Sequence, residues 1–198
     1  MNHKKMQRFV LTALFVALVL LLGFTPIGMI PLGFINASIL CTPVVVGTLL
    51  LGLRSGLLLG FSFGAVSAIN AILRPSTLVA ALMGRSPALT MVMCFLPRLL
   101  VPVVAWLVYR LVSGGERAKR RAVPFAAVAG SLTNTVLYLG LMLLFYVMLG
   151  INSEKVLALI GGTGLIAGGS EAVVAALIAT PVLAALWSAQ KRSGRKLQ

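Results

Sequence analysis

The sequence contains no aspartate, and its 198 residues include only three acidic side chains, Glu116, Glu154 and Glu171. It has one histidine, His3, and two cysteines, so it offers no basis for a metal site built from several histidines or for histidine-based catalysis. A soluble domain needs a surface of mixed charges, which this chain cannot supply. Because 60% of its residues are hydrophobic, its composition indicates a chain whose solvent is mostly lipid.

The basic residues are abundant, and the formal net charge of +14 would suggest nucleic acid binding in a soluble protein. Here they cluster beside apolar segments, at 4–8, 110–121 and 191–196. Such clusters are typical of the cytoplasmic loops of membrane proteins, where they also contact anionic lipid headgroups. We therefore expect contact with the lipid bilayer and no binding of nucleic acid.

The apolar segments indicate several membrane spans, since a spanning helix needs ~20 mostly apolar residues. We predict an all-α integral membrane protein with a single membrane domain, 1–198, and six transmembrane helices at about 6–24, 36–53, 56–73, 88–112, 122–149 and 170–189. Glycine pairs at 161–162 and 168–169 break the last apolar stretch, so we expect a separate short helix at about 156–167. Irregular backbone at membrane depth needs protein or water around it, so this break indicates a cavity.

The distribution of basic residues predicts the orientation of the chain. Arg54 and the three basic clusters lie in segments on one side, whereas the loops on the other side hold only Arg74, Arg85 and Lys155. Cytoplasmic loops carry the excess of lysine and arginine. We therefore expect both termini in the cytoplasm and the loops at 25–35, 74–87 and 150–169 outside.

Arg98 and Glu171 are charged residues within or beside predicted spans, where a charge is costly unless it is paired. Two interpretations stay open. An Arg98–Glu171 ion pair would hold the fourth and sixth spans together, or Arg98 would bind the carboxylate of a substrate with two hydrogen bonds. Glu171 at a helix start also benefits from the helix dipole, so its position does not require a ligand.

Several uncharged polar residues are further candidates for binding a polar ligand. Asn134 lies in the middle of the fifth span, and an amide can recognise hydroxyls and amides. An interhelical hydrogen bond is an equally good explanation for it. The other candidates lie in the same span or towards the outer ends of the second and third spans: Thr133, Tyr138, Asn70 and Asn36.

Motifs along nearly the whole chain resemble those of the substrate-binding (S) components of energy-coupling factor (ECF) vitamin transporters. They are the segments 24–28, 31–33, 36–37, 42–44, 51–64, 97–98, 131–135 and 171–175. The resemblance implies a six-helix fold in a bacterial plasma membrane and binding of one water-soluble vitamin from outside. Within the family the chain is most similar to the pantothenate-type members.

The resemblance also implies partners: a transmembrane coupling subunit and two ATPase subunits. In the family an Ala-x-x-x-Ala motif on the first helix contacts the coupling subunit, and Ala13 and Ala17 match it. Taken by themselves, these alanines are equally consistent with packing inside the protein. The chain has no phosphate-binding Gly-x-x-x-x-Gly-Lys-Ser/Thr motif, so ATP hydrolysis is expected in the partners, and we expect no enzymatic activity, cofactor or metal site here.

Other functions stay open as alternatives. The ligand would then be another vitamin, such as folate, riboflavin or a pyrimidine or pyridoxine precursor, or the chain would be a secondary transporter that works alone. Against the second, Glu171 is the only carboxylate within a predicted span and no inverted repeat is evident. An intramembrane enzyme is disfavoured because the sequence has neither paired acids nor a convincing Ser/Lys dyad.

Overall fold

The computed structural model describes residues 3–25, 29–31, 36–114, 116–151, 154–159, 162 and 165–192. In these residues the regular structure consists of helices and one small hairpin, joined by short turns. The helices are α1 (His3–Phe24), α2 (Cys41–Leu51), α3 (Leu53–Leu73), α4 (Thr77–Arg85), α5 (Pro87–Val112), α6 (Glu116–Met148), α7 (Glu154–Leu159) and α8 (Leu165–Arg192). The strands β1 (Met29–Pro31) and β2 (Asn36–Ser38) pair antiparallel, with Met29 opposite Ser38.

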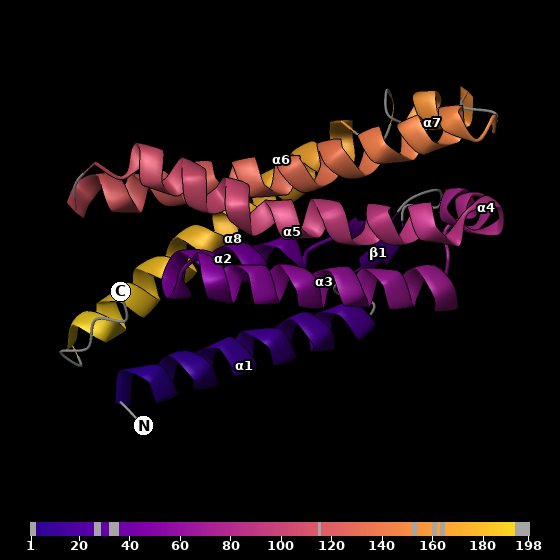
Figure 1. Cartoon of the computed structure of the whole chain (residues 1–198). Coiled ribbons are helices and arrows are strands. Elements are labelled where there is room, and N and C mark those ends of the chain that lie inside the picture. The colour runs from indigo at the N-terminus through magenta and orange to yellow at the C-terminus, as the bar shows by residue number, and fades with distance from the viewer. Residues whose placement is uncertain are drawn as a thin grey trace.

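Five of the described helices are long and apolar enough to cross a membrane. Their spanning portions are Lys5–Phe24, Leu53–Leu73, Pro87–Val112, Ala118–Met148 and Gly168–Ala189. Figure 1 shows them arranged as an elongated bundle, with both termini at one end and α4 and α7 at the other. The chain is therefore a helical, multi-pass membrane protein.

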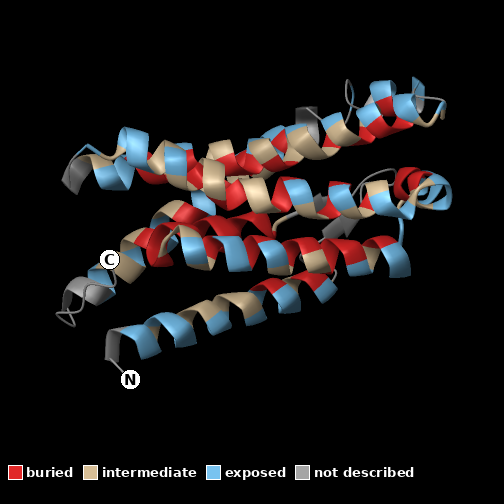
Figure 2. Cartoon of the chain, viewed as in Figure 1, coloured by how far each residue is buried: buried red, intermediate tan, exposed pale blue. Residues whose placement is uncertain are grey.

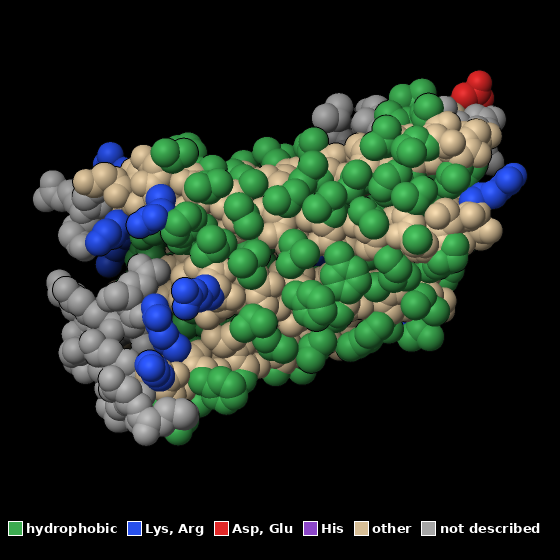
Figure 3. Space-filling view, in the orientation of Figure 1, with side chains coloured by type: hydrophobic (Ala, Val, Ile, Leu, Met, Phe, Trp, Pro, Cys, Tyr) green, Lys and Arg blue, Asp and Glu red, His purple; other side chains and the backbone are tan. Residues whose placement is uncertain are grey.

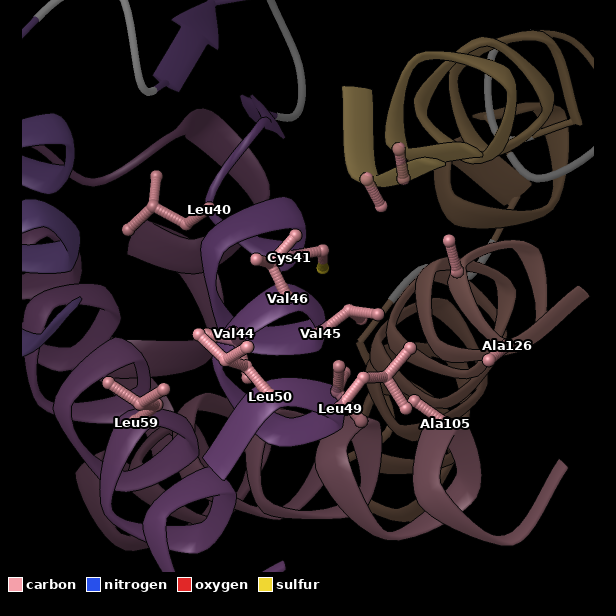
Figure 4. Packing of buried hydrophobic residues seen from close by; sticks show 14 of the residues in the cluster. Leu40, Cys41, Val44, Val45, Val46, Leu49, Leu50, Leu59, Ala105 and Ala126 are labelled. Carbon is pink, nitrogen blue, oxygen red and sulfur yellow. The ribbon is translucent and has the colours of Figure 1, made fainter. Parts of the chain in front are cut away.

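The structure differs from the prediction of one spanning helix at 36–53. Residues 36–38 form strand β2, and α2 has only 11 residues before it ends at Gly52, whose φ of 93° lies in a region that glycine adopts at little cost. Every residue of α2 is buried, because the helix packs against α1, α3, α5, α6 and α8. In Figure 4, Val44 points towards Leu59 of α3, whereas Val45 and Leu49 point towards Ala105 and Ala126. An apolar sequence shows only that a segment is shielded from water. Here protein rather than lipid surrounds the segment.

Two further segments differ from the predicted boundaries. The predicted outer loop at 74–87 contains α4, whose Leu78, Val79 and Leu82 are buried and whose Leu78 carbonyl accepts a hydrogen bond from the Tyr146 hydroxyl at 2.7 Å. The short helix predicted at 156–167 corresponds in part to α7, while residues 160, 161, 163 and 164 lie outside the described residues.

Helix α8 starts at Leu165, so the predicted break at Gly168 and Gly169 lies inside a helix. Gly168 faces α6, where an added Cβ would lie 2.8 Å from the Thr135 side chain, whereas Gly169 faces open space. Gly168 therefore serves the close approach of two helices.

Basic residues are concentrated at one end of the bundle, and buried residues lie along the contacts between its helices. Lys and Arg side chains gather at the end that holds the termini, and hydrophobic side chains cover much of the length between the ends (Figure 3). Buried residues follow the seams between helices, and α1 is mostly exposed or half-buried (Figure 2). One hydrophobic cluster surrounds α2 and includes Val101, and a second joins α4, α5 and α6 and includes Cys94. On α5 the charged Arg98 lies between the two clusters.

Candidate binding pocket

A polar pocket lies where α3 meets α4, at the end of the bundle opposite the termini. It is lined by residues of α3 and the following turn, of α4, of α5 and of α6: Ser67, Asn70, Ala71, Arg74, Pro75, Ser76, Val79, Cys94, Arg98 and Tyr138. Arg74 is exposed, whereas Arg98 is buried. The pocket therefore leads from an exposed cation to a buried one.

Arg98 is buried, with only 6% of its surface exposed, and it contacts groups on several sides. Its Nη1 donates a hydrogen bond to the Met93 carbonyl oxygen at 3.1 Å. Its guanidinium carbon lies 4.5 Å from the centre of the Tyr138 ring and 5.3 Å from that of Phe63, distances at which a cation is attracted to an aromatic face. Its Nε is buried and has no hydrogen-bond partner among the described residues. Arg98 thus has a fixed position and a spare donor.

Two more buried polar atoms lack partners within the described part of the chain, and both belong to α6. They are Asn134 Oδ1 and Ser131 Oγ, in side chains that are 5% and 0% exposed. Buried polar groups normally have a partner, so an orphaned one indicates a bound water or ligand. Ser131 and Asn134 are three residues apart and therefore lie on one side of the helix.

Glu171 lies on α8, where its Oε2 accepts a hydrogen bond from Thr135 Oγ1 of α6 at 3.4 Å. Cys41, the first residue of α2, lies close enough to Glu171 and Arg98 to interact electrostatically with both. The start of α2 and the two charged side chains therefore belong to one region of the bundle. A direct Arg98–Glu171 pair stays a prediction.

The remaining candidates have different positions. Asn70 lines the pocket, and its Nδ2 donates to the Gly23 carbonyl at 3.0 Å, which joins α3 to the end of α1. Thr133 donates to the Ala129 carbonyl of its own helix at 2.7 Å. The backbone of Asn36 lies in β2, but its side chain lies outside the described residues. Of the predicted residues, the pocket thus brings together Arg98, Asn70 and Tyr138.

Several residues that line the pocket or lie buried without a partner were not among the candidate binding residues predicted from the sequence. Ser67, Cys94 and the α4 residue Val79 line the pocket, and Ser131 is one of the orphaned groups. One usable signal was the apolar content of 77–83, which suggests a helix that packs on the bundle.

Ala13 and Ala17 lie far along the sequence from these residues, on α1. Both are exposed, as is Leu14 between them, and Phe9 and Leu21 extend the exposed face. No described helix covers this face, so the two alanines do not form an internal seam between described helices.

Comparison with known proteins gives the chain a family. The family model described as "ECF transporter, substrate-specific component" matches residues 7–183. The pantothenic acid transporter PanT of Lactococcus lactis subsp. cremoris (strain MG1363) is 27% identical over 169 residues, which cover 80% of this chain and 82% of that protein. With a family match over most of its length and a bundle of apolar helices, the chain belongs to the substrate-specific components of ECF transporters.

Proposed function

We propose that this chain captures pantothenate from outside the cell and presents it to an ATP-driven energy-coupling module. The observation that carries the proposal is the buried guanidinium of Arg98, which lines an open pocket and has a donor without a partner. A buried cation is costly, and a ligand carboxylate would complete its coordination.

The chemistry of pantothenate matches Arg98, which lines the pocket, and two buried polar groups of α6 that do not line it, Asn134 and Ser131. The molecule carries a carboxylate, hydroxyls and an amide. The carboxylate suits Arg98, and the orphaned Asn134 Oδ1 accepts from a hydroxyl or an amide N–H. Ser131 Oγ both donates and accepts, and so suits a hydroxyl. The name of the relative from Lactococcus lactis supports the same ligand.

We also propose that six segments cross the membrane, with α2 and the segment before it as the sixth, and that both termini lie in the cytoplasm. The gathering of Lys and Arg at the end that holds the termini supports this orientation. The pocket, which lies near the other end, would then open to the outside.

Family membership supports partners of this chain, namely a transmembrane coupling subunit and two ATPase subunits. We propose that Ala13 and Ala17 form part of the docking face. Small side chains allow another helix to approach closely, and the described residues leave this face of α1 exposed.

The test of the ligand is equilibrium binding of radiolabelled pantothenate to the full chain purified in detergent. We expect saturable binding that unlabelled pantothenate displaces and that folate, riboflavin and pyridoxine do not. Saturable binding of one of those vitamins in its own labelled form, with no saturable binding of pantothenate, would show that the other vitamin is the ligand. A chain that binds none of them would contradict vitamin capture by this chain.

A further inference from the structure

Pro97 lies inside α5, immediately before Arg98, and is buried. A proline has no backbone N–H, so the carbonyl four residues earlier loses its helical hydrogen bond. For Pro97 that carbonyl belongs to Met93. The proline ring also pushes against the same carbonyl, which tilts it away from the helix axis. The sequence therefore leaves the Met93 oxygen available to another donor.

Arg98 supplies that donor. Its Nη1 lies 3.1 Å from the Met93 oxygen, five residues back along the same helix. Met93 is closer than Arg98 to the start of α5, which is the end that adjoins α4 and the pocket. The contact therefore turns the guanidinium back along the helix towards the pocket.

The rest of the guanidinium is confined by its neighbours, but its hydrogen-bonding capacity is not fully used. The rings of Tyr138 and Phe63 lie near it on α6 and α3, and Nε is left without a partner among the described residues. A guanidinium held at one nitrogen and confined by rings loses little conformational freedom when it binds an anion.

We propose that Pro97 is a positioning residue for substrate recognition: by freeing the Met93 carbonyl, it fixes the Arg98 guanidinium in the orientation that receives the ligand carboxylate. This inference rests on the proposed function, in which Arg98 binds the carboxylate of pantothenate. It assigns to the proline an effect on the acid group alone, not on the rest of the ligand.

Pro102 provides a matched control in the same helix. It is also buried, and it frees the carbonyl of Arg98 itself. That oxygen lies against Gly60 of α3, where an added Cβ would be only 2.6 Å away. Pro102 thus affects how α3 and α5 pack, whereas Pro97 affects the side chain of Arg98.

The first test compares Pro97→Ala and Pro102→Ala for binding of pantothenate and of its analogue with the carboxylate reduced to an alcohol. Alanine at 97 restores the N–H that competes for the Met93 oxygen. We expect Pro97→Ala to weaken binding of the acid about tenfold and to change binding of the alcohol by less than about twofold. Pro102→Ala should leave the ratio of the two affinities unchanged. An unchanged ratio in Pro97→Ala would overturn the proposal.

A second measurement needs no ligand, and so separates this inference from the proposed function. Nitrogen NMR of isotope-labelled arginine side chains, with the Arg98 signal identified by its loss in Arg98→Gln, reports on the guanidinium directly. We expect the Arg98 signal to shift and broaden in Pro97→Ala and to stay in place in Pro102→Ala. An Arg98 signal that is identical in parent and Pro97→Ala would refute the role of Pro97, even if pantothenate binds. A shifted signal in a chain that does not bind pantothenate would support that role and contradict only the ligand.

Discussion

Arg98 has two alternative roles, one in ligand binding and one in the stability of the fold. Its charge lies in the interior of a membrane protein, where the ordinary compensation by water is absent. One nitrogen is satisfied by a backbone carbonyl and the cation lies near two aromatic rings, yet a donor is left over. Both a ligand carboxylate and Glu171 are possible partners for the remaining hydrogen-bonding capacity, and they predict different mutant behaviour.

If the ligand is the partner, Arg98→Gln should leave the chain folded and weaken pantothenate binding by ~2–5 kcal/mol, because one side of a desolvated charge pair is lost. The alcohol analogue should bind the variant nearly as well as it binds the parent. Calorimetric titration of both ligands, next to thermal unfolding in detergent, gives the comparison.

If Glu171 is the partner, the same change should lower the unfolding temperature, since it leaves a carboxylate without its cation. Arg98→Gln/Glu171→Gln should then recover part of the lost stability. A variant that is as stable as the parent and binds the acid normally would contradict both roles of Arg98.

Two of the predicted site residues are buried polar side chains, and they share one physical property. Arg98 and Asn134 are costly to place among apolar side chains, so their presence in apolar segments pointed to a site. Ser131 gave no such signal, because hydroxyls in helices usually bond to a carbonyl of the preceding turn, as Thr133 does to Ala129. Only the folded chain distinguishes a hydroxyl that is satisfied in this way from one that is not.

At the scale of elements, α2 shows that hydropathy alone cannot distinguish a membrane-spanning helix from a short helix buried in protein. Residues 36–53 are apolar enough to predict a span, yet the structure has an 11-residue helix that is buried on all sides. Lipid and protein interiors select the same side chains, so composition cannot distinguish them. The spanning portions of the long, partly exposed helices were predicted within a few residues, because their length itself is a signal.

The contact of α3 with α5 depends on Gly60. An added Cβ there would lie 2.6 Å from the Arg98 carbonyl oxygen and 3.2 Å from the Pro102 ring, and a backbone atom cannot move aside cheaply. Gly60→Ala should therefore separate the helices and destabilise the chain by ~1–3 kcal/mol. Gly140→Ala is the control, because it lies in a long apolar helix and an added Cβ would meet nothing within 4 Å.

Thermal unfolding in detergent should show a lower midpoint for Gly60→Ala and an unchanged or slightly higher midpoint for Gly140→Ala. Because Arg98 lies at the same contact, the Gly60 variant should also bind pantothenate more weakly. Equal midpoints for the two variants would show that α3 and α5 have room to separate at this point.

At the scale of the whole molecule, the uneven distribution of basic residues predicts an orientation in the membrane. Ser113 lies between α5 and α6 near Arg110, and Gly84 lies near the end of α4 at the opposite end of the bundle. In intact cells, a membrane-impermeant thiol reagent should label Gly84→Cys and not Ser113→Cys. The parent chain sets the background, because its Cys41 and Cys94 are buried. Labelling of Ser113→Cys alone would invert the proposed orientation and place the pocket inside.

The docking of the coupling subunit is also a property of the whole assembly, and it separates binding from transport. Ala13 and Ala17 lie on the exposed side of α1, away from the residues that line the pocket. Ala13→Trp and Ala17→Trp should therefore abolish pantothenate uptake by cells that express the full complex, because a large ring prevents close approach of the partner helix. Binding by the isolated variants should match the parent.

Val136→Trp, at a 65% exposed position on α6, controls for the bulk of tryptophan at an exposed site and should support normal uptake. If the α1 variants lost binding and uptake together, the alanines would have a role in the fold of this chain, and the docking face would have to lie on another helix.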